Sequence, residues 1–511
     1  MLTLCQVAIP VSTNGDQWIA AEVLRDEFIH EQSLLDTSIP VEDEAEASLE
    51  LSAKFLAFVA HKIDNASDEC KAVYTQLLLS IFKHFIATYL LENDIHSVTS
   101  NYNTEVRKTV LSAYIKALAS LRTNGVSNVP SGPQSALFAA ARAGNASIFA
   151  LFGGQGTNEV YFDELQSLYD IYKPFVAPFI AEVTRDVLVP VIAEHYHTSH
   201  FTFGLDALSW LSGASERPAT SYLATVPISF PLIGLTQLVQ FLVVCHIAGI
   251  TPGQLRDKMA GATGHSQGIV SAVVIAASST FESFTENAKK ALKWLIFSGL
   301  RGQQAFPVVS LDPEMVQDAI DGGEGSPSPM LSVTGLSLKD LEPHIALTNS
   351  HLPDTSQLFV SLHNGPRAFV VTGPAKALFG LVTNLRKIRA SSGLDQSKIP
   401  FSQRKQVFSV RFLVVGVPYH SEYLAGVAEK VLNEDLKGVE LWKSGDLRIP
   451  VYNTDDGNIF TIEYISYLIL IRFRLARTVR FGHEVLVRVD LHKADSLVDC
   501  DQVPRFCYAC H

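Results

Sequence analysis

Cysteine is scarce in this sequence, and so is positive charge. The 511 residues include six cysteines, and 40 lysines and arginines stand against 52 aspartates and glutamates, which gives a net charge of −12. So few cysteines do not build a disulfide scaffold, and an acidic chain does not attract nucleic acid or an anionic membrane. Glycine and proline number 31 and 23, and hydrophobic residues make up 47%. A collagen-like or globally disordered chain is therefore excluded.

The sequence also lacks targeting signals. The N-terminal segment MLTLCQVAIPVSTNGDQW has neither a basic stretch nor a long apolar core, so we expect no signal peptide and a cytoplasmic location. Residues 230–250 form an uncharged run long enough to cross a bilayer, yet the nearest cations, Arg217 and Arg256, are distant. Five residues interrupt the run: Pro231, Gly234, Gln237, Gln240 and His246. We therefore predict a buried core helix and no membrane partner.

The hydrophobic pattern divides the chain into four segments. Residues 1–134 carry apolar residues at helical spacing and end in a turn-rich linker. Residues 135–306 and 413–457 alternate short strands with helices, as in an α/β layer architecture. Residues 307–412 show the order β-α-β-β-α-β, typical of a split βαβ unit inserted in the main domain, with a helix start at Ser337 and Asp340. Residues 458–511 follow no pattern that we can place on a packed fold.

The strongest chemical signal is Gly-His-Ser-Gln-Gly at 264–268. In the G-x-S-x-G pattern a serine lies on a tight turn between a strand and a helix, with its hydroxyl exposed. Ser266 is thus a candidate nucleophile, and the backbone N–H of Gln267 is a candidate oxyanion donor. A structural glycine turn is the alternative.

Two further segments complement this serine. Gly153, Gly154, Gln155 and Gly156 follow a strand candidate, but they lack the third glycine of a dinucleotide-binding fingerprint and no P-loop occurs. This loop either offers backbone N–H groups to an oxyanion or is an ordinary glycine turn. His420 follows a strand candidate at 411–417 and is a candidate general base, although a lone histidine is more often structural.

Together these segments resemble the acyltransferase domain at the N-terminus of the fungal fatty acid synthase β subunit, or of a related secondary-metabolite (hexanoate-type) β subunit. The segments that match in order and spacing are IFALFGGQG, TPGQLRDKMAGATGHSQGIVSAV, PSPMLSVTGLSLKDLE, HNGPRAFVVTGP, SSGLDQSKIPFSQRK and VPYHS. The resemblance covers roughly residues 3–457. It implies an α/β-hydrolase-like acyltransferase core with an inserted ferredoxin-like subdomain, preceded by a mostly helical N-terminal region.

The resemblance also implies an activity. Ser266 and His420 would form a catalytic dyad, and the backbone N–H groups of Gln155 and Gln267 would bind the oxyanion. An acyl group would pass from acyl-CoA to Ser266 and then to the phosphopantetheine arm of an acyl carrier protein, with no permanently bound cofactor. The implied partners are that carrier protein, a synthase α subunit and other β subunits. Asn364 would contact substrate or support the site.

The starter group is inferred from one segment, LKWLIFSGLRGQQAFP. Malonyl-selective relatives place an Arg-Gly pair where our preferred alignment puts Ser298-Gly299; Arg301-Gly302 offers a rival register. Without a guanidinium to pair with a free carboxylate, we expect a neutral acetyl or short acyl starter.

Two other functions stay open. A serine esterase or thioesterase would take an acidic residue from the interval between Ser266 and His420, which contains Asp312, Asp318, Asp340, Asp354 and Asp395. An inactive scaffold fragment is the other alternative, because a segment that supports the catalytic histidine in relatives is not found. Metal or haem sites are weaker candidates; they rest on His195, His197 and His200, and on Cys500, Cys507, Cys510 and His511.

Overall fold

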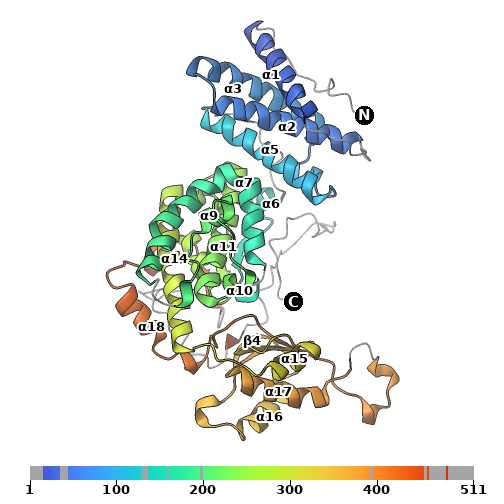
Figure 1. Cartoon of the computed structure of the whole chain (residues 1–511), viewed down its shortest axis with the longest axis vertical. Coiled ribbons are helices and arrows are strands. Elements are labelled where there is room, and N and C mark those ends of the chain that lie inside the picture. Colours follow the sequence, from blue (N-terminus) through green and yellow to red (C-terminus); the bar gives the residue numbers. More distant parts are fainter. Residues whose placement is uncertain are drawn as a thin grey trace.

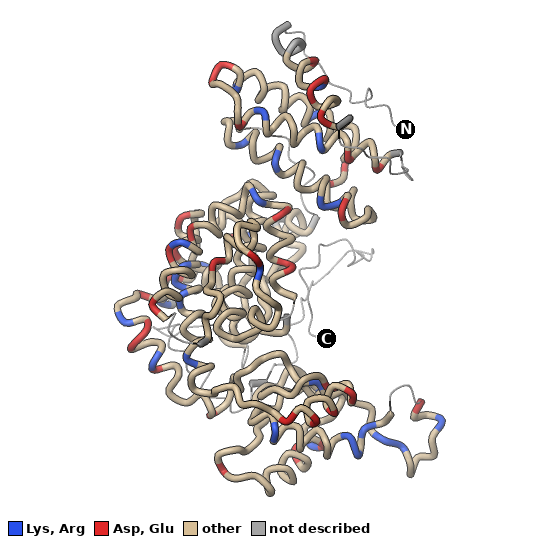
Figure 2. The backbone as a smooth tube through the Cα atoms, in the orientation of Figure 1, with Lys and Arg blue, Asp and Glu red and all other residues tan. Residues whose placement is uncertain are grey.

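A computed structural model describes residues 15–34, 44–127, 129, 136–157, 160–195, 199–391, 395–453, 457–459 and 479–480. His197 and the four C-terminal candidates at 500–511 lie outside these residues. Three groups of elements follow one another along the long axis of the molecule (Figure 1): N-terminal helices, a helix-rich core with a small parallel sheet, and a smaller α/β unit. Charged residues of both signs occur in each group (Figure 2).

The N-terminal group consists of helices, as the apolar spacing predicts. Its elements are α1 (Gly15–Leu34), α2 (Glu44–Asp64), α3 (Asp68–Phe85), η2 (Ile86–Leu90), α4 (Ile95–Val98) and α5 (Thr104–Thr123). The Asn103 side chain accepts from two backbone N–H groups and so starts α5. Helix α5 packs on α7 of the core, where Lys108 forms an ion pair with Asp170 at 2.6 Å. The His96 ring lies 2.8 Å from the Tyr172 hydroxyl.

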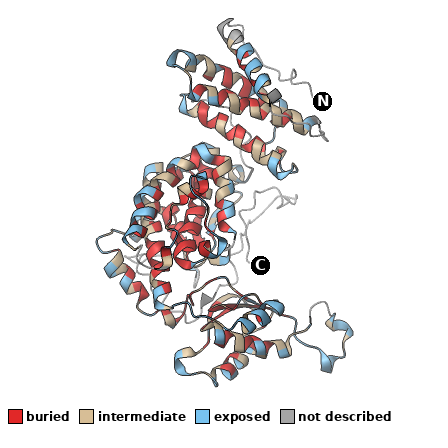
Figure 3. Ribbon diagram, viewed as in Figure 1, coloured by how far each residue is buried: buried red, intermediate tan, exposed pale blue. Residues whose placement is uncertain are grey.

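The core group is built around one long buried helix. Its helices are α6 (Ala136–Arg142), α7 (Tyr161–Val183), η4 (Thr184–Leu188), α8 (Val189–Glu194), η5 (Ser199–Phe201), α9 (Ala207–Ser212), α10 (Thr220–Leu223), α11 (Val226–Ala248), α12 (Pro252–Arg256), α13 (Gly268–Ala277), α14 (Phe281–Ala305), α18 (Val427–Lys430) and η10 (Val431–Asp435). Helix α11 packs against α7 and α14. It is apolar enough to cross a bilayer by length and composition, and 89% of that stretch is buried (Figure 3), which agrees with the predicted core helix.

The core sheet has three parallel strands in the order β1-β2-β7: β1 (Phe149–Phe152), β2 (Gly261–Gly264) and β7 (Val451–Tyr452). Phe152 pairs with Gly264, so β1 and β2 end at the same level. The sequence predicts a buried first strand, but Phe149 and Leu151 are 40% and 51% exposed. The reason is that β1 lies at the edge of the sheet, and these two side chains share a face that the described residues leave partly uncovered.

The third group has its own hydrophobic core. After α15 (Pro313–Asp321) come β3 (Met330–Thr334), α16 (Leu338–Asn349), β4 (Phe359–Gly365), β5 (Ala368–Thr372), α17 (Ala375–Ile388) and β6 (Ser409–Phe412). This is the expected order β-α-β-β-α-β, and Ser337 caps α16 as expected. The strand order is β6-β3-β5-β4, with β8 (Val479–Arg480) added beside β4. Neighbours among the first four strands are antiparallel.

Candidate active site

Ser266 lies on a tight turn between β2 and α13. Its φ of +51° is a left-handed conformation that few non-glycine residues adopt. The flanking glycines are required by space: a Cβ on Gly264 would overlap the backbone of Gly268, and a Cβ on Gly268 would overlap the carbonyl groups of Phe152 and Gly153. The turn therefore holds the serine at the N-terminal end of α13, where the helix dipole favours negative charge.

His420 meets this serine from a distant part of the chain. Its Nε2 lies 3.0 Å from Ser266 Oγ, within hydrogen-bond distance, although the two residues are 154 positions apart. His420 also has a positive φ of +60° and is only 7% exposed. The preceding Tyr419 stacks on Phe230 of α11 at 4.9 Å. The structure thus brings together the hydroxyl and the imidazole that the sequence suggested as a pair.

The loop after β1 passes directly beside the serine. A Cβ on Gly154 would lie 3.2 Å from Ser266 Cβ and 2.9 Å from His265 Nδ1. Gln155 begins the short helix η3 (Gln155–Thr157), and its side-chain amide donates to Ser229 of α11 at 3.1 Å. Gln267 occupies the N-cap position of α13 and is 1% exposed. The N–H groups of a first helical turn have no partner within the helix; the role of Gln155 and Gln267 as oxyanion donors stays a prediction.

Asn364 reaches the same turn from β4. Its Oδ1 lies 3.3 Å from His265 Nε2, so the ring donates to the amide oxygen. Burial lowers the pKa of His265, and the bond to Asn364 partly opposes this shift. The third group of elements is thus tied to the residue next to Ser266. Asn364 therefore contacts a residue of the serine turn. A contact between Asn364 and the substrate stays a prediction.

Comparison with known proteins identifies the family. Residues 150–406 match a family described as starter unit:ACP transacylase in aflatoxin biosynthesis, and residues 2–121 match the N-terminal domain in fatty acid synthase subunit beta. The fatty acid synthase subunit beta of Schizosaccharomyces pombe is 40% identical over 91% of this chain and 22% of its own length. That of Saccharomyces cerevisiae is 39% identical over 82% of this chain and 20% of its own.

The chain belongs to the N-terminal acyltransferase region of fungal fatty acid synthase β subunits. It spans about a fifth of the length of these curated relatives. Among solved structures, a malonyl CoA-acyl carrier protein transacylase from Coxiella burnetii aligns at 16% identity and a TM-score of 0.41, over 66% of this chain and 81% of that chain. The resemblance inferred from the motifs is confirmed.

Ser298 and Arg301, the residues of the two candidate registers, lie in different surroundings. Ser298 on α14 is 2% exposed, and its carbonyl lies 3.5 Å from the hydroxyl of Tyr419, the neighbour of His420. Arg301 instead forms two hydrogen bonds with Asp435, at 2.7 and 2.8 Å, and one with Glu434. Its guanidinium is thus already paired with carboxylates of η10.

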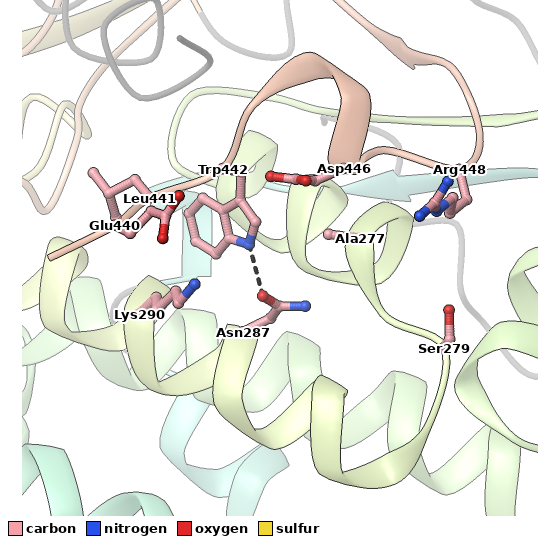
Figure 4. A pocket seen from close by; sticks show the side chains of 9 residues that line it. All are labelled: Ala277, Ser279, Asn287, Lys290, Glu440, Leu441, Trp442, Asp446 and Arg448. Carbon is pink, nitrogen blue, oxygen red and sulfur yellow. Dashed lines mark hydrogen bonds between the residues drawn. The ribbon is translucent and has the colours of Figure 1, made fainter.

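A polar cavity of about 340 Å³ lies elsewhere in the core group (Figure 4). Its lining includes Ala277 and Ser279, which end and follow α13, and Trp442, whose ring N–H donates to Asn287 at 2.9 Å. Ser266 precedes the other end of α13, a helix about 15 Å long. This cavity is therefore distinct from the serine–histidine site.

Within the described part of the chain, no group of three His, Cys, Asp or Glu side chains is placed to hold an ion; the metal and haem hypotheses also involve residues outside it. The His195 ring packs edge-on against Phe297, and burial lowers the pKa of His200. Three residues next to the site were not predicted from the sequence: Phe230, Tyr419 and Gln237. The signal that could have identified Gln237 is its polar side chain within the uncharged run at residues 230–250.

Proposed function

We propose that this chain is an acyl-CoA:acyl-carrier-protein S-acyltransferase that loads an acetyl or short acyl starter in fatty acid synthesis. The observation that carries the proposal is the 3.0 Å approach of Ser266 Oγ to His420 Nε2. It is supported by membership of the family and by the loop that passes beside the serine.

The chemistry follows from these groups. His420 Nε2 takes the proton of Ser266 as Oγ attacks the thioester carbonyl, because a serine hydroxyl is a weak nucleophile until a base removes its proton. The backbone N–H groups of Gln155 and Gln267 stabilise the oxyanion. Coenzyme A leaves as a thiol with the proton from His420. The phosphopantetheine thiol of the carrier protein then gives its proton to His420 and attacks the acyl-serine carbonyl. The bond from that carbonyl to Ser266 Oγ breaks, and His420 returns the proton to Oγ, which restores Ser266.

A neutral starter is the substrate that we propose. A free carboxylate on the acyl group would need a cation, and Arg301 is paired with Asp435 and Glu434. Ser298, the residue of the preferred register, is uncharged. Malonyl-CoA should therefore acylate Ser266 far more slowly than acetyl-CoA.

Four of the five aspartates named between Ser266 and His420 fit a hydrolase poorly. Asp312, Asp340 and Asp395 form hydrogen bonds at the starts of their own helices, and Asp318 pairs with Arg386. We infer that these carboxylates serve local structure, which favours transfer over hydrolysis.

We also propose the finer architecture. The strand order β6-β3-β5-β4 with α16 and α17 is that of a ferredoxin-like insert at 307–412. The serine turn after a parallel strand suits an α/β-hydrolase-like core at 135–306 and 413–457. The helical region 1–134 precedes it. The proposed partners are a carrier protein, a synthase α subunit and other β subunits, in the cytoplasm.

A discharge assay tests the activity. The protein is incubated with radiolabelled acetyl-CoA, and carrier protein is then added. We expect label on the protein that moves to the carrier, no label on Ser266→Ala, and at least about a thousandfold slower labelling of His420→Ala. Release of free acetate would indicate a hydrolase. Absence of label on the unaltered protein would favour the scaffold alternative.

A further inference from the structure

The long buried helix α11 carries a polar side chain, Gln237. Gln237 is 9% exposed in a helix without charged residues. Both ends of its amide are engaged: Nε2 donates to the Gly153 carbonyl at 2.8 Å, and Oε1 accepts from the Ser271 hydroxyl at 2.7 Å. Ser271 is 1% exposed. A buried amide is costly unless both its donor and its acceptor are satisfied, and here both are.

The two partners of Gln237 belong to the two segments that carry the proposed oxyanion donors. Gly153 precedes Gln155 in the loop after β1. Ser271 follows Gln267 by one turn of α13. Because the peptide unit is planar, a bond to the Gly153 carbonyl fixes the plane of the peptide that enters Gly154, beside Ser266. A second bond from α11, between Ser229 and the Gln155 side chain, anchors the loop two residues later.

We infer that Gln237 is a positioning residue that sets the distance and orientation between the two halves of the oxyanion hole. This inference rests on the proposed function. Oxyanion donors must be preorganised to within a few tenths of an ångström of the transition state. The side chain of Gln237 crosses between the loop and α13, and its amide is directional at both ends. An apolar side chain there would fill the space without fixing either segment.

The first test replaces the amide by a hydrocarbon of similar size. In Gln237→Leu we expect single-turnover acetylation of Ser266 to slow by about 10- to 100-fold. This decrease in rate is no larger than the decrease that removal of one oxyanion donor typically causes. The KM for acetyl-CoA should stay within about threefold, because the interaction acts in the transition state. Gln240→Leu is the matched control: it lies one turn later on α11, and its amide donates to Glu164. Its rate should be unchanged.

The second test measures how the rate of a variant depends on pH. In Gln237→Glu the introduced carboxyl donates to the Gly153 carbonyl only when it is protonated, and burial raises the pKa of such a group. The ratio of the variant rate to the wild-type rate should therefore rise as the pH falls from about 8 to about 6. Taking the ratio removes the pH effects that the variant shares with the unaltered protein. The same ratio for Gln237→Leu should be flat with pH, whereas a purely structural role would leave both ratios flat.

Each outcome decides the inference. If thermal melting shows that Gln237→Leu does not fold, Gln237→Glu and Ser271→Ala test the inference instead. Ser271→Ala removes only the hydroxyl that donates to the Gln237 amide, and it should slow acetylation less than tenfold. Normal rates in all variants, or a loss confined to KM, would overturn the role of Gln237. Labelling of the unaltered protein is measured first, so that failure of the proposed function is recognised separately.

Discussion

At the scale of single residues, the site is shaped by glycines that are needed for space and by two non-glycine residues that accept strained backbone. Gly154, Gly264 and Gly268 lie where a Cβ would press on neighbouring backbone or side chains. Ser266 and His420 adopt positive φ instead. Such strain persists only where the surroundings hold it, and it is common at active sites.

Gly154 offers a test at this scale. In Gly154→Ala the added methyl group would press on His265 and Ser266, and overpacking of this kind typically costs about 1–3 kcal/mol. We expect acetylation of Ser266 to slow by about tenfold or more. Gly156→Ala is the control, since nothing lies within 4 Å of its Cβ position. Equal rates for the two variants would contradict the close approach, measured by single-turnover labelling.

At the scale of elements, the third group is held together by a buried carboxylate. Glu324 is fully buried and accepts from Arg386 at 2.6 Å and from Arg389 at 2.6 Å. Both arginines lie at the C-terminal end of α17, whereas Glu324 follows α15. The hydrogen bonds that Arg386 donates to the Glu324 carboxylate raise the pKa of Arg386. This cluster joins two helices that belong to different parts of the unit.

Removing the charge of Glu324 should loosen that junction. Breaking a buried ion pair on one side typically costs about 3–5 kcal/mol, and because both arginines keep some contact with water we expect about 2–3 kcal/mol for Glu324→Gln. Asp318→Asn removes a carboxylate that also pairs with Arg386 but is 55% exposed; it should cost less than about 1 kcal/mol. Urea unfolding of both variants measures the difference, and similar values would contradict this account.

At the scale of the whole molecule, the N-terminal helices and the core meet around a half-buried histidine, His246. His246 of α11 stacks between Phe175 and Phe281, with ring centroids 4.9 and 4.6 Å apart, and Arg122 of α5 donates to its carbonyl. Burial, and secondarily the charge of Arg122, lowers the pKa of His246 to about 4.

This shift predicts a loss of stability in acid. The unfolded chain binds a proton at His246 below about pH 6.5, whereas the folded chain does so only near pH 4. Acid therefore favours unfolding, and the free energy of unfolding should fall by up to about 3 kcal/mol between these pH values from this residue. His246→Phe keeps the aromatic stack and should show a flatter pH dependence in chemical unfolding. Parallel curves for variant and wild type would count against it.

Much of the architecture was predictable because its signals are local. Helix-spaced apolar residues predicted α2, α3 and α5, and the Ser337 cap and the strand-helix order predicted the third group. The spacing of glycines around Ser266 predicted a turn between a strand and a helix. The exposed face of β1 was not predictable, because its apolar residues do not reveal that the strand lies at a sheet edge.

The sequence by itself determined the family, the elements and the identity of the candidate groups, since motifs, caps and periodicity act within a few residues. Only the tertiary structure decided which groups meet. It places His420 against Ser266, 154 residues away in the sequence, and pairs Arg301 with Asp435. It also joins Gln237 by hydrogen bonds to two segments of the site. Contacts between distant residues depend on how whole helices and strands pack, and no local pattern in the chain encodes that packing.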